Sequence, residues 1–192
     1  MSNVDPLARF HAWLAEAEAA KLPEPTAMAL ATVDAEGAPA VRMVLLKHAD
    51  AAGFVFYTNL QSPKALALAA RPVAELCFYW KPPGRQVRIH GLVTPVSGAE
   101  ADAYFASRPY LSRIGAWASD QSRPLPGALT IPERVARLSL RYLSEVPRPP
   151  HWGGFRLVPD WMELWEEKPY RLHDRVRYQR TAEGWSATSL FP

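Results

Sequence analysis

The sequence of 192 residues contains a single cysteine, and none of its apolar stretches approaches the roughly 18 residues that a membrane-spanning helix needs. Cys77 therefore cannot form a disulfide within the chain, which fits a reducing compartment. At the start of the chain, no basic segment is followed by an apolar one, so we expect no secretory signal there. These absences predict a cytoplasmic protein that has no membrane partner.

A strong charge of one sign and the signatures of common enzyme classes are missing too. The net charge is +3, which is too small to predict nucleic-acid binding. The sequence has no glycine-rich phosphate loop and no nucleophile elbow. Its five histidines lie too far apart for a metal-ligand motif, so we expect no metal site. If the protein is an enzyme, a bound organic cofactor is expected to supply the difficult chemistry.

Proline, by contrast, is abundant: its 19 residues are about twice the usual share, and they divide the chain into short elements. The hydrophobic periodicity predicts helices over 6–20, 63–71 and 132–143, and a short helix after Ser97. Residues 107–130 are expected to be irregular. Strands are predicted over 27–33, 41–47, 54–58, 73–80, 85–93, 154–158, 161–166, 174–180 and 184–190.

These roughly nine strands and four helices do not alternate as they would in a parallel α/β protein. The order favours a mainly β fold, an antiparallel barrel with helices packed outside it. We find no internal repeat, and no linker is long enough to divide the chain. Residues 1–192 are therefore expected to form one domain.

Cationic side chains are placed on or beside several of these elements. Lys64 lies in the first turn of a predicted helix, where free backbone N–H groups also favour an anion. Arg171, His173 and Arg175 would share one face of an extended segment and would repel one another unless acids or an anion lay among them. Any one of these charges alone is more simply explained as a solvated surface group. Taken as a set, they favour one or two phosphate groups as ligands.

Six short stretches between Asp5 and Pro192 are more informative as an ordered set than any one of them is alone. They are RMVLLK at 42–47, FVFYTN at 54–59, YFASRP at 104–109, IGAWASDQS at 114–122, WGGFR at 152–156 and RLHDR at 171–175. In content and order they resemble the pyridoxine (pyridoxamine) 5′-phosphate oxidase family.

The resemblance implies an FMN-binding split barrel with peripheral helices that works as a homodimer and holds FMN between its subunits. The C-terminal segment, about 152–192, would complete the barrel and the active site. The implied reaction oxidises pyridoxine or pyridoxamine 5′-phosphate with O2 to pyridoxal 5′-phosphate. It releases H2O2, and also NH3 when the substrate is the amine. Hydride transfer from the substrate C4′ carbon to flavin N5 would be the central step.

The resemblance also assigns residues to the site. Arg171 is expected to orient the substrate near its reacting carbon, and His173 to hydrogen-bond to it; these two are the predicted catalytic residues. The implied substrate contacts are Lys47, Tyr104, Arg108, Ser112, Arg171, Leu172 and His173. The implied FMN contacts are Arg42, Met43, Val44, Leu45, Leu46, Lys47, Tyr57, Thr58, Lys64, Gln86, Gln121, Ser122, Trp165 and Arg175.

The sequence departs from the family pattern in three places. Pro63 stands where the family usually has an arginine, which predicts weaker FMN binding than in a typical member. Tyr110 and Arg113 replace the more usual Arg and Gln around Ser112. Only four residues precede Asp5, so the N-terminal segment that helps to cover the active site in many members is expected to be absent or to lie outside this sequence.

Two other functions remain open. A related FMN-dependent oxidase of the phenazine-pathway type would keep the fold and the cofactor but act on another substrate. A split-barrel protein without activity could instead bind flavin, haem or pyridoxal phosphate as a carrier or sensor. The complete set of implied substrate contacts favours a phosphorylated substrate over both.

Overall fold

The structure is a computed structural model that describes residues 5–192. The expectations about the first four residues lie outside this part. Helix α1 (Pro6–Ala19) begins as predicted: the Asp5 carboxylate accepts a hydrogen bond from the backbone N–H of Leu7, at 3.0 Å, and Pro6 occupies the first turn. Its inner face buries Phe10, Trp13 and Ala17.

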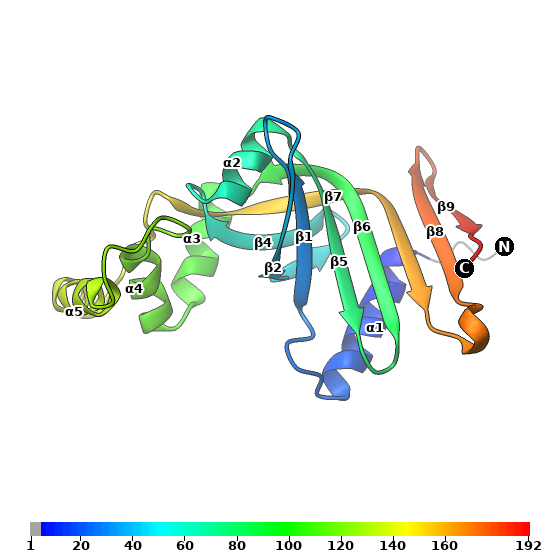
Figure 1. The fold of residues 1–192 in the computed structure, drawn as a ribbon, viewed down its shortest axis with the longest axis horizontal. Coiled ribbons are helices and arrows are strands. Elements are labelled where there is room, and N and C mark those ends of the chain that lie inside the picture. Colours follow the sequence, from blue (N-terminus) through cyan, green and yellow to red (C-terminus); the bar gives the residue numbers. More distant parts are fainter. Residues whose placement is uncertain (1–4) are drawn as a thin grey trace.

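The described residues contain nine strands, all paired antiparallel in one curled sheet (Figure 1). Their order is β2-β1-β5-β6-β7-β4-β3, and β8 and β9 continue from β7. This confirms the predicted mainly β class with helices outside the sheet. The strands are β1 (Ala27–Val33), β2 (Pro39–Leu45), β3 (His48–Asp50), β4 (Gly53–Asn59), β5 (Val73–Trp80), β6 (Arg85–Pro95), β7 (Trp152–Glu166), β8 (Asp174–Thr181) and β9 (Gly184–Ser189).

Strand β7 connects the two ends of the molecule. One of its edges pairs with β6, while the other pairs first with β4 and then, from Trp161 onward, with β8. The prediction of two separate strands, 154–158 and 161–166, is therefore wrong. Pro159 lies in the middle of one strand, opposite Gly91 and a register shift in β6. A Cβ atom on Gly91 would lie 1.9 Å from the Val158 carbonyl oxygen, so glycine permits this close approach.

The described chain also contains five α-helices, one more than predicted. Residues 107–130 are not irregular throughout, because helix α4 (Tyr110–Ala118) occupies part of this range and buries Ile114 and Ala118 one turn apart. Pro109 forms the N-cap of α4, so this helix starts directly after a proline. The other helices are α2 (Pro63–Ala70), α3 (Gly98–Ser107), α5 (Thr130–Arg141) and the 3-10 turn η1 (Pro169–Arg171).

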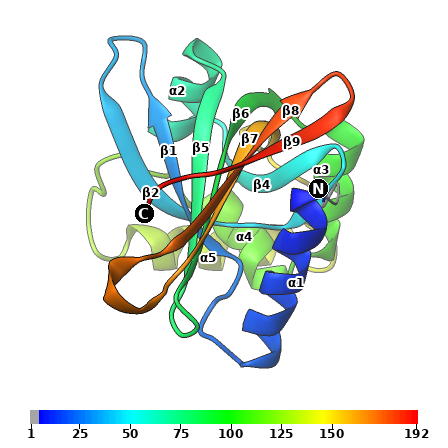
Figure 2. The ribbon, with the colours of Figure 1, turned by 90° about the vertical axis from the view of Figure 1, so that its right-hand side faces the viewer.

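Two apolar cores hold these elements together. The main core lies between the sheet and α1. There the ring of Phe10 packs edge-to-face against Phe54 and Phe78, with ring centroids 5.1 Å apart in each pair. Figure 2 looks along the molecule from the β8–β9 end and shows α1 beside the curled sheet. A smaller core joins Phe105 and Trp152 to α4 and α5. Helices α3, α4 and α5 lie at one end of the long axis and the β8–β9 hairpin at the other (Figure 1).

The main core gives a prediction for stability. Phe10 is fully buried, so Phe10→Ala removes a ring from three aromatic neighbours and should cost about 3–5 kcal/mol of unfolding free energy. Leu140→Ala is the matched control, since its side chain is 77% exposed, and it should cost less than about 0.5 kcal/mol. Urea unfolding of the purified variants measures both. Equal midpoints would contradict this assignment of the core.

Candidate functional site

A cavity of about 680 Å³, here called the central pocket, opens between β2, β4 and helices α2, α3 and α4. It brings together predicted site residues from five separate stretches of the chain. Those among its lining are Met43, Val44, Leu45, Lys47, Tyr57, Thr58, Lys64, Tyr104, Arg108, Ser112 and Gln121.

The central pocket is cationic. Lys47, Lys64 and Arg108 all line it, and none of the described residues in its wall is an aspartate or glutamate. Charges held out of water without a counter-charge are unfavourable, and burial lowers the pKa of both Lys64 and Arg108. The proximity of Arg42 lowers the pKa of Lys64 further. Such a pocket favours an anionic ligand, because the ligand would supply the missing charge.

Lys64 has only neutral partners. It is buried at the start of α2, where its Nζ donates to Gln121 Oε1 at 2.8 Å and to Thr58 Oγ1 at 3.2 Å. A third bond goes to Ser62 Oγ at 3.2 Å. Ser62 occupies the N-cap position, but its side chain does not cap the helix; its hydroxyl donates to the Asn59 carbonyl at 2.7 Å. Ser62 therefore supports the lysine and not the helix N-terminus.

Arg108 has an N–H with no protein acceptor. Its guanidinium lies over the ring of Trp152, 4.9 Å from the centroid, and close to Phe105. Within the described residues its Nη1 is buried and has no hydrogen-bond partner. A buried, unpaired donor is costly in a folded protein. This donor is therefore available for a ligand oxygen in the pocket.

An aromatic stack forms one wall of the central pocket. The ring of Tyr57 stacks on Tyr104, with centroids 4.1 Å apart, and on Trp152, with centroids 5.2 Å apart. Gly154 lies against the Tyr57 ring, and a Cβ atom there would be 2.6 Å from Cδ1 of that ring. The absence of a side chain at this position thus leaves room for the Tyr57 ring. Trp152 was not among the predicted site residues, although it opens the WGGFR stretch.

A second cavity of about 420 Å³, here called the C-terminal groove, lies where β7 ends and η1 begins. Three predicted residues line it, namely Trp165, Arg171 and His173. Arg171 is in a 3-10 turn with φ of +61°, next to Tyr170 with φ of +58°. The expectation that Arg171, His173 and Arg175 share one extended face is therefore wrong for Arg171.

The ring of His173 has a defined orientation. It lies 4.6 Å from the Trp165 ring, and its Nδ1 accepts a hydrogen bond from the backbone N–H of Lys168 at 3.2 Å. Because an N–H can only donate, Nδ1 is the unprotonated nitrogen of the neutral ring. The proton of neutral His173 is therefore on Nε2, which makes Nε2 a donor.

Two further predicted residues, Gln86 and Arg175, lie beside Trp165 on the outer face of the sheet. Gln86 is opposite Trp165 in the β6–β7 register, and Trp165 is opposite Arg175 in the β7–β8 register. Tyr79 of β5 extends the row on the other side of Gln86 and also lines the C-terminal groove. The pairing of four strands thus aligns Tyr79, Gln86, Trp165 and Arg175, here called the flavin row after the role expected for three of them.

Besides Gln86 and Arg175, four predicted residues line neither cavity. Arg42 donates from Nη1 to Thr32 Oγ1 at 2.8 Å and to two backbone carbonyls, and Leu46 is buried in the main core. Ser122 is exposed with φ of +67°, and the Leu172 side chain is largely exposed. The roles that the resemblance assigns to these four stay predictions.

The two cavities are separate within one chain. The central pocket adjoins α3 and α4 at one end of the long axis, and the C-terminal groove adjoins η1 near the other end (Figure 1). A single chain therefore does not bring Arg171 and His173 to Arg108. The described residues contain no cluster of three His, Cys, Asp or Glu side chains suited to a metal ion, and no helix among them is long and apolar enough to cross a membrane.

A curled antiparallel sheet with a cationic pocket at its edge defines the class: a split-barrel protein with a site for anionic ligands. Residues 14–141 match the family model described as pyridoxamine 5′-phosphate oxidase. Residues 152–192 match the pyridoxine 5′-phosphate oxidase C-terminal dimerisation region. The chain belongs to the pyridoxamine 5′-phosphate oxidase family, which confirms the resemblance.

Individual relatives agree with this assignment. A pyridoxine/pyridoxamine 5′-phosphate oxidase of Rhodospirillum rubrum is 56% identical, over 100% of this chain and 98% of its own. One from Hyphomonas neptunium is 54% identical, over 98% and 87%. Among solved structures, PhzG from Burkholderia lata in complex with tetrahydrophenazine-1-carboxylic acid is 34% identical with a TM-score of 0.93, covering 98% of this chain and 93% of that one. A pyridoxamine 5′-phosphate oxidase-related, FMN binding protein from Nostoc punctiforme, 19% identical with a TM-score of 0.82 over 98% of both chains, shares the fold.

The aromatic wall gives a second prediction. Gly154→Ala should displace the Tyr57 ring and reduce the near-ultraviolet circular dichroism of the Tyr57–Tyr104–Trp152 stack, with a loss of about 1–3 kcal/mol in stability. Gly98→Ala is the control, since nothing lies within 4 Å of a Cβ atom there. An unchanged spectrum for Gly154→Ala would show that the stack does not depend on this glycine.

Proposed function

We propose that this protein is an FMN-dependent oxidase that converts pyridoxine or pyridoxamine 5′-phosphate into pyridoxal 5′-phosphate, reducing O2 to H2O2. The amine substrate also consumes water and releases NH3. The observation that carries the proposal is the central pocket, with three cations and no carboxylate among its described lining residues. Substrate and FMN would each bring a phosphate. We further propose that residues 1–192 act as one cytoplasmic domain.

The residues of the central pocket fit FMN. Lys64 is a buried cation without a counter-charge, and a phosphate would supply one. Gln121 Oε1 already accepts bonds from Lys64 and Thr58, so its amide N–H groups remain for a ligand acceptor. The β2 residues Met43 to Leu45 add apolar surface for a ring system. When bound, FMN would take a hydride from the substrate and return the electrons to O2.

A homodimer would join the two parts of the site. The C-terminal groove holds Arg171 and His173 away from the central pocket of the same chain. Strand β2 carries an apolar sequence but is mostly exposed, with Val41 at 70% and Met43 at 63%, which is typical of a surface that another subunit covers. The match of residues 152–192 to a dimerisation region supports the same arrangement. We propose that the C-terminal groove of one protomer faces the central pocket of its partner.

The protein's own side chains would bind and orient the substrate. Arg108 has a buried free N–H for the substrate phosphate, and Lys47, Ser112 and Tyr104 line the same pocket. The stack of Tyr57, Tyr104 and Trp152 would exclude water from one side. His173 would donate from Nε2 to an oxygen of the substrate, and Arg171 would orient the ring. The rate would then come from placement and electrostatics, since the proposal needs no side-chain nucleophile.

A phenazine-type oxidase is the second candidate, because the structure of PhzG overlays this chain with a TM-score of 0.93. The two functions make different demands on the pocket. A phosphorylated substrate needs Arg108 and Lys47 as phosphate donors, whereas a substrate without phosphate does not. The relatives that are 52–56% identical carry the pyridoxine/pyridoxamine 5′-phosphate oxidase name, which favours the first candidate.

The proposed function is tested by adding pyridoxine 5′-phosphate to the purified yellow protein without air. We expect the visible flavin absorbance to bleach, and to return with H2O2 formation when air is admitted. Unphosphorylated pyridoxine is the control and should bleach it much more slowly. A colourless protein that does not take up FMN would rule out the proposal, and bleaching by a dihydrophenazine alone would favour the second candidate.

Two arginines should affect catalysis differently. Arg108→Met should raise KM for pyridoxine 5′-phosphate by about 10–100-fold with little change in kcat, because it removes a charged hydrogen bond to the unreactive phosphate. Arg171→Met should mainly lower kcat. Arg137→Met, on the exposed face of α5, is the control and should change neither. Steady-state kinetics measures all three, and a fall in kcat alone for both site variants would refute these roles.

A further inference from the structure

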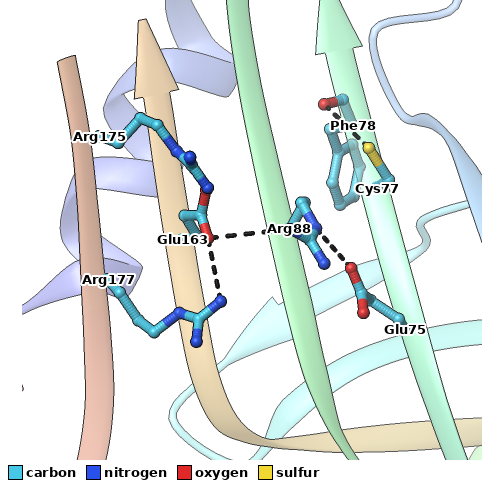
Figure 3. Close-up of polar contacts among 7 residues, drawn as sticks. All are labelled: Glu75, Cys77, Phe78, Arg88, Glu163, Arg175 and Arg177. Atoms are coloured by element: carbon cyan, nitrogen blue, oxygen red, sulfur yellow. Dashed lines mark hydrogen bonds and ion pairs between the residues drawn. The ribbon is translucent and has the colours of Figure 1, made fainter. Parts of the chain in front are cut away.

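A second row of side chains lies beside the flavin row on the outer face of the sheet. The strand registers place Cys77, Arg88, Glu163 and Arg177 opposite one another on β5, β6, β7 and β8. Figure 3 shows these side chains with Glu163 between the arginines. Glu163 is 1% exposed, and a carboxylate that is so deeply buried is stable only when it is paired.

Three arginines surround the Glu163 carboxylate, and its two oxygens have different partners. Oε1 accepts two bonds from Arg175, from Nε at 3.0 Å and from Nη2 at 2.7 Å. Oε2 accepts from Arg177 Nη2 at 3.2 Å and lies 3.8 Å from Arg88 Nη1. Arg88 has its own carboxylate in Glu75, whereas Arg175 depends on Glu163 for its charge pairing (Figure 3). Oε1 thus binds Arg175, which is the one arginine of this group that belongs to the flavin row.

The bonds of Arg175 fix both its position and its free donors. A guanidinium has five N–H groups. Two of those of Arg175 go to Glu163, and a third goes from Nη1 to the Phe191 carbonyl at 3.1 Å. At most two N–H groups therefore remain, in a side chain that is held beside Trp165 and in line with Gln86. Arg175 is therefore fixed in orientation and still able to donate a hydrogen bond to an acceptor atom of a ligand.

Arg177 is held independently. Its guanidinium lies over the Trp161 ring, 4.5 Å from the centroid, and Arg88 lies over the same ring at 5.3 Å. If Glu163 lost its charge, Arg175 and Arg177 would face each other with no acid between them, and Arg175 would lose its only ion pair among the described residues. Arg175 would then turn away from the flavin row.

We propose that Glu163 is a positioning residue for the cofactor: it holds the guanidinium of Arg175 in the orientation that contacts FMN. The proposal rests on the proposed function, because it takes FMN as the ligand of the flavin row. Glu163 itself would touch neither cofactor nor substrate, so it acts through Arg175. If Glu163 had only a structural role, its loss would destabilise the fold and would not change the affinity of the folded protein for FMN.

The test compares FMN binding by the full-length apoproteins of wild type, Glu163→Gln and Glu75→Gln, followed by the quenching of flavin fluorescence. Glu163→Gln should raise the FMN dissociation constant about tenfold or more, because Arg175 loses a charged partner. Glu75→Gln is the matched control: it removes a carboxylate from the same face but from Arg88 only, and its dissociation constant should stay within about threefold of wild type.

A double-mutant cycle separates positioning from general stabilisation. Arg175→Gln should weaken FMN binding, and the double variant Glu163→Gln/Arg175→Gln should bind FMN no more weakly than Arg175→Gln alone. Losses that multiply in the double variant, or wild-type affinity of Glu163→Gln, would overturn the proposal. If Glu163→Gln does not fold, Glu163→Asp replaces it: the shorter side chain withdraws the carboxylate from Arg175, and wild-type affinity would again overturn the proposal.

Failure of the proposed function gives a different result. Wild-type apoprotein that does not quench flavin fluorescence would refute FMN binding itself. Tight binding by wild type together with unaffected binding by Glu163→Gln would refute only the positioning role. The thermal midpoint of each apoprotein, measured without FMN, shows whether a change in affinity accompanies a change in folding.

Discussion

The two halves of the site depend on the hydrogen bonding of one strand. β7 keeps β6 along one edge for most of its length, while its other edge changes partner from β4 to β8. The change occurs around Pro159, which cannot donate a backbone hydrogen bond, and Gly91 leaves room for the strand opposite. The first part of β7 supports the aromatic wall of the central pocket, and the second part carries Glu163 and Trp165. A shift of one residue in this register would turn both sets of side chains to the wrong face.

The buried and partly buried cations of the protein are held in two ways. In the central pocket Lys64 and Arg108 are held by neutral oxygens and aromatic rings, so their charge remains available to a ligand. On the outer face of the sheet Arg175 and Arg177 are paired with Glu163. Arg108 has no carboxylate partner, so its charge is available to pair with an anion. Arg175 has a carboxylate partner that fixes its orientation, while at most two of its N–H groups stay free for a ligand.

Much of the fold could be predicted from local patterns. The Asp5-Pro6 start of α1 and the alternation of Val87 and Ile89 with Gln86 and Arg88 follow from rules that act over a few residues. Helix α4 was missed within a range that was expected to be irregular, although proline is frequent at helix starts and Pro109 is its N-cap. The strand β3 was missed because three residues carry too little pattern.

The candidate site was predicted as a set of residues, but its division was not. The motifs place Arg108 and Arg171 in the site, but their order along the chain does not show that they line different cavities. Glu163 was not predicted as a site residue, because the sequence shows only that it alternates with Trp161 and Trp165 along one strand. Its burial depends on arginines from two other strands, which only the sheet register brings together.

The bond from Arg175 to the Phe191 carbonyl has a practical consequence for work with this protein. The acceptor is one residue from the last residue of the sequence, so the tail after β9 is bound to the same face as the flavin row. An affinity tag fused after Pro192 would be attached next to that acceptor and could pull it away. Recombinant versions of the protein are therefore better tagged at the other terminus.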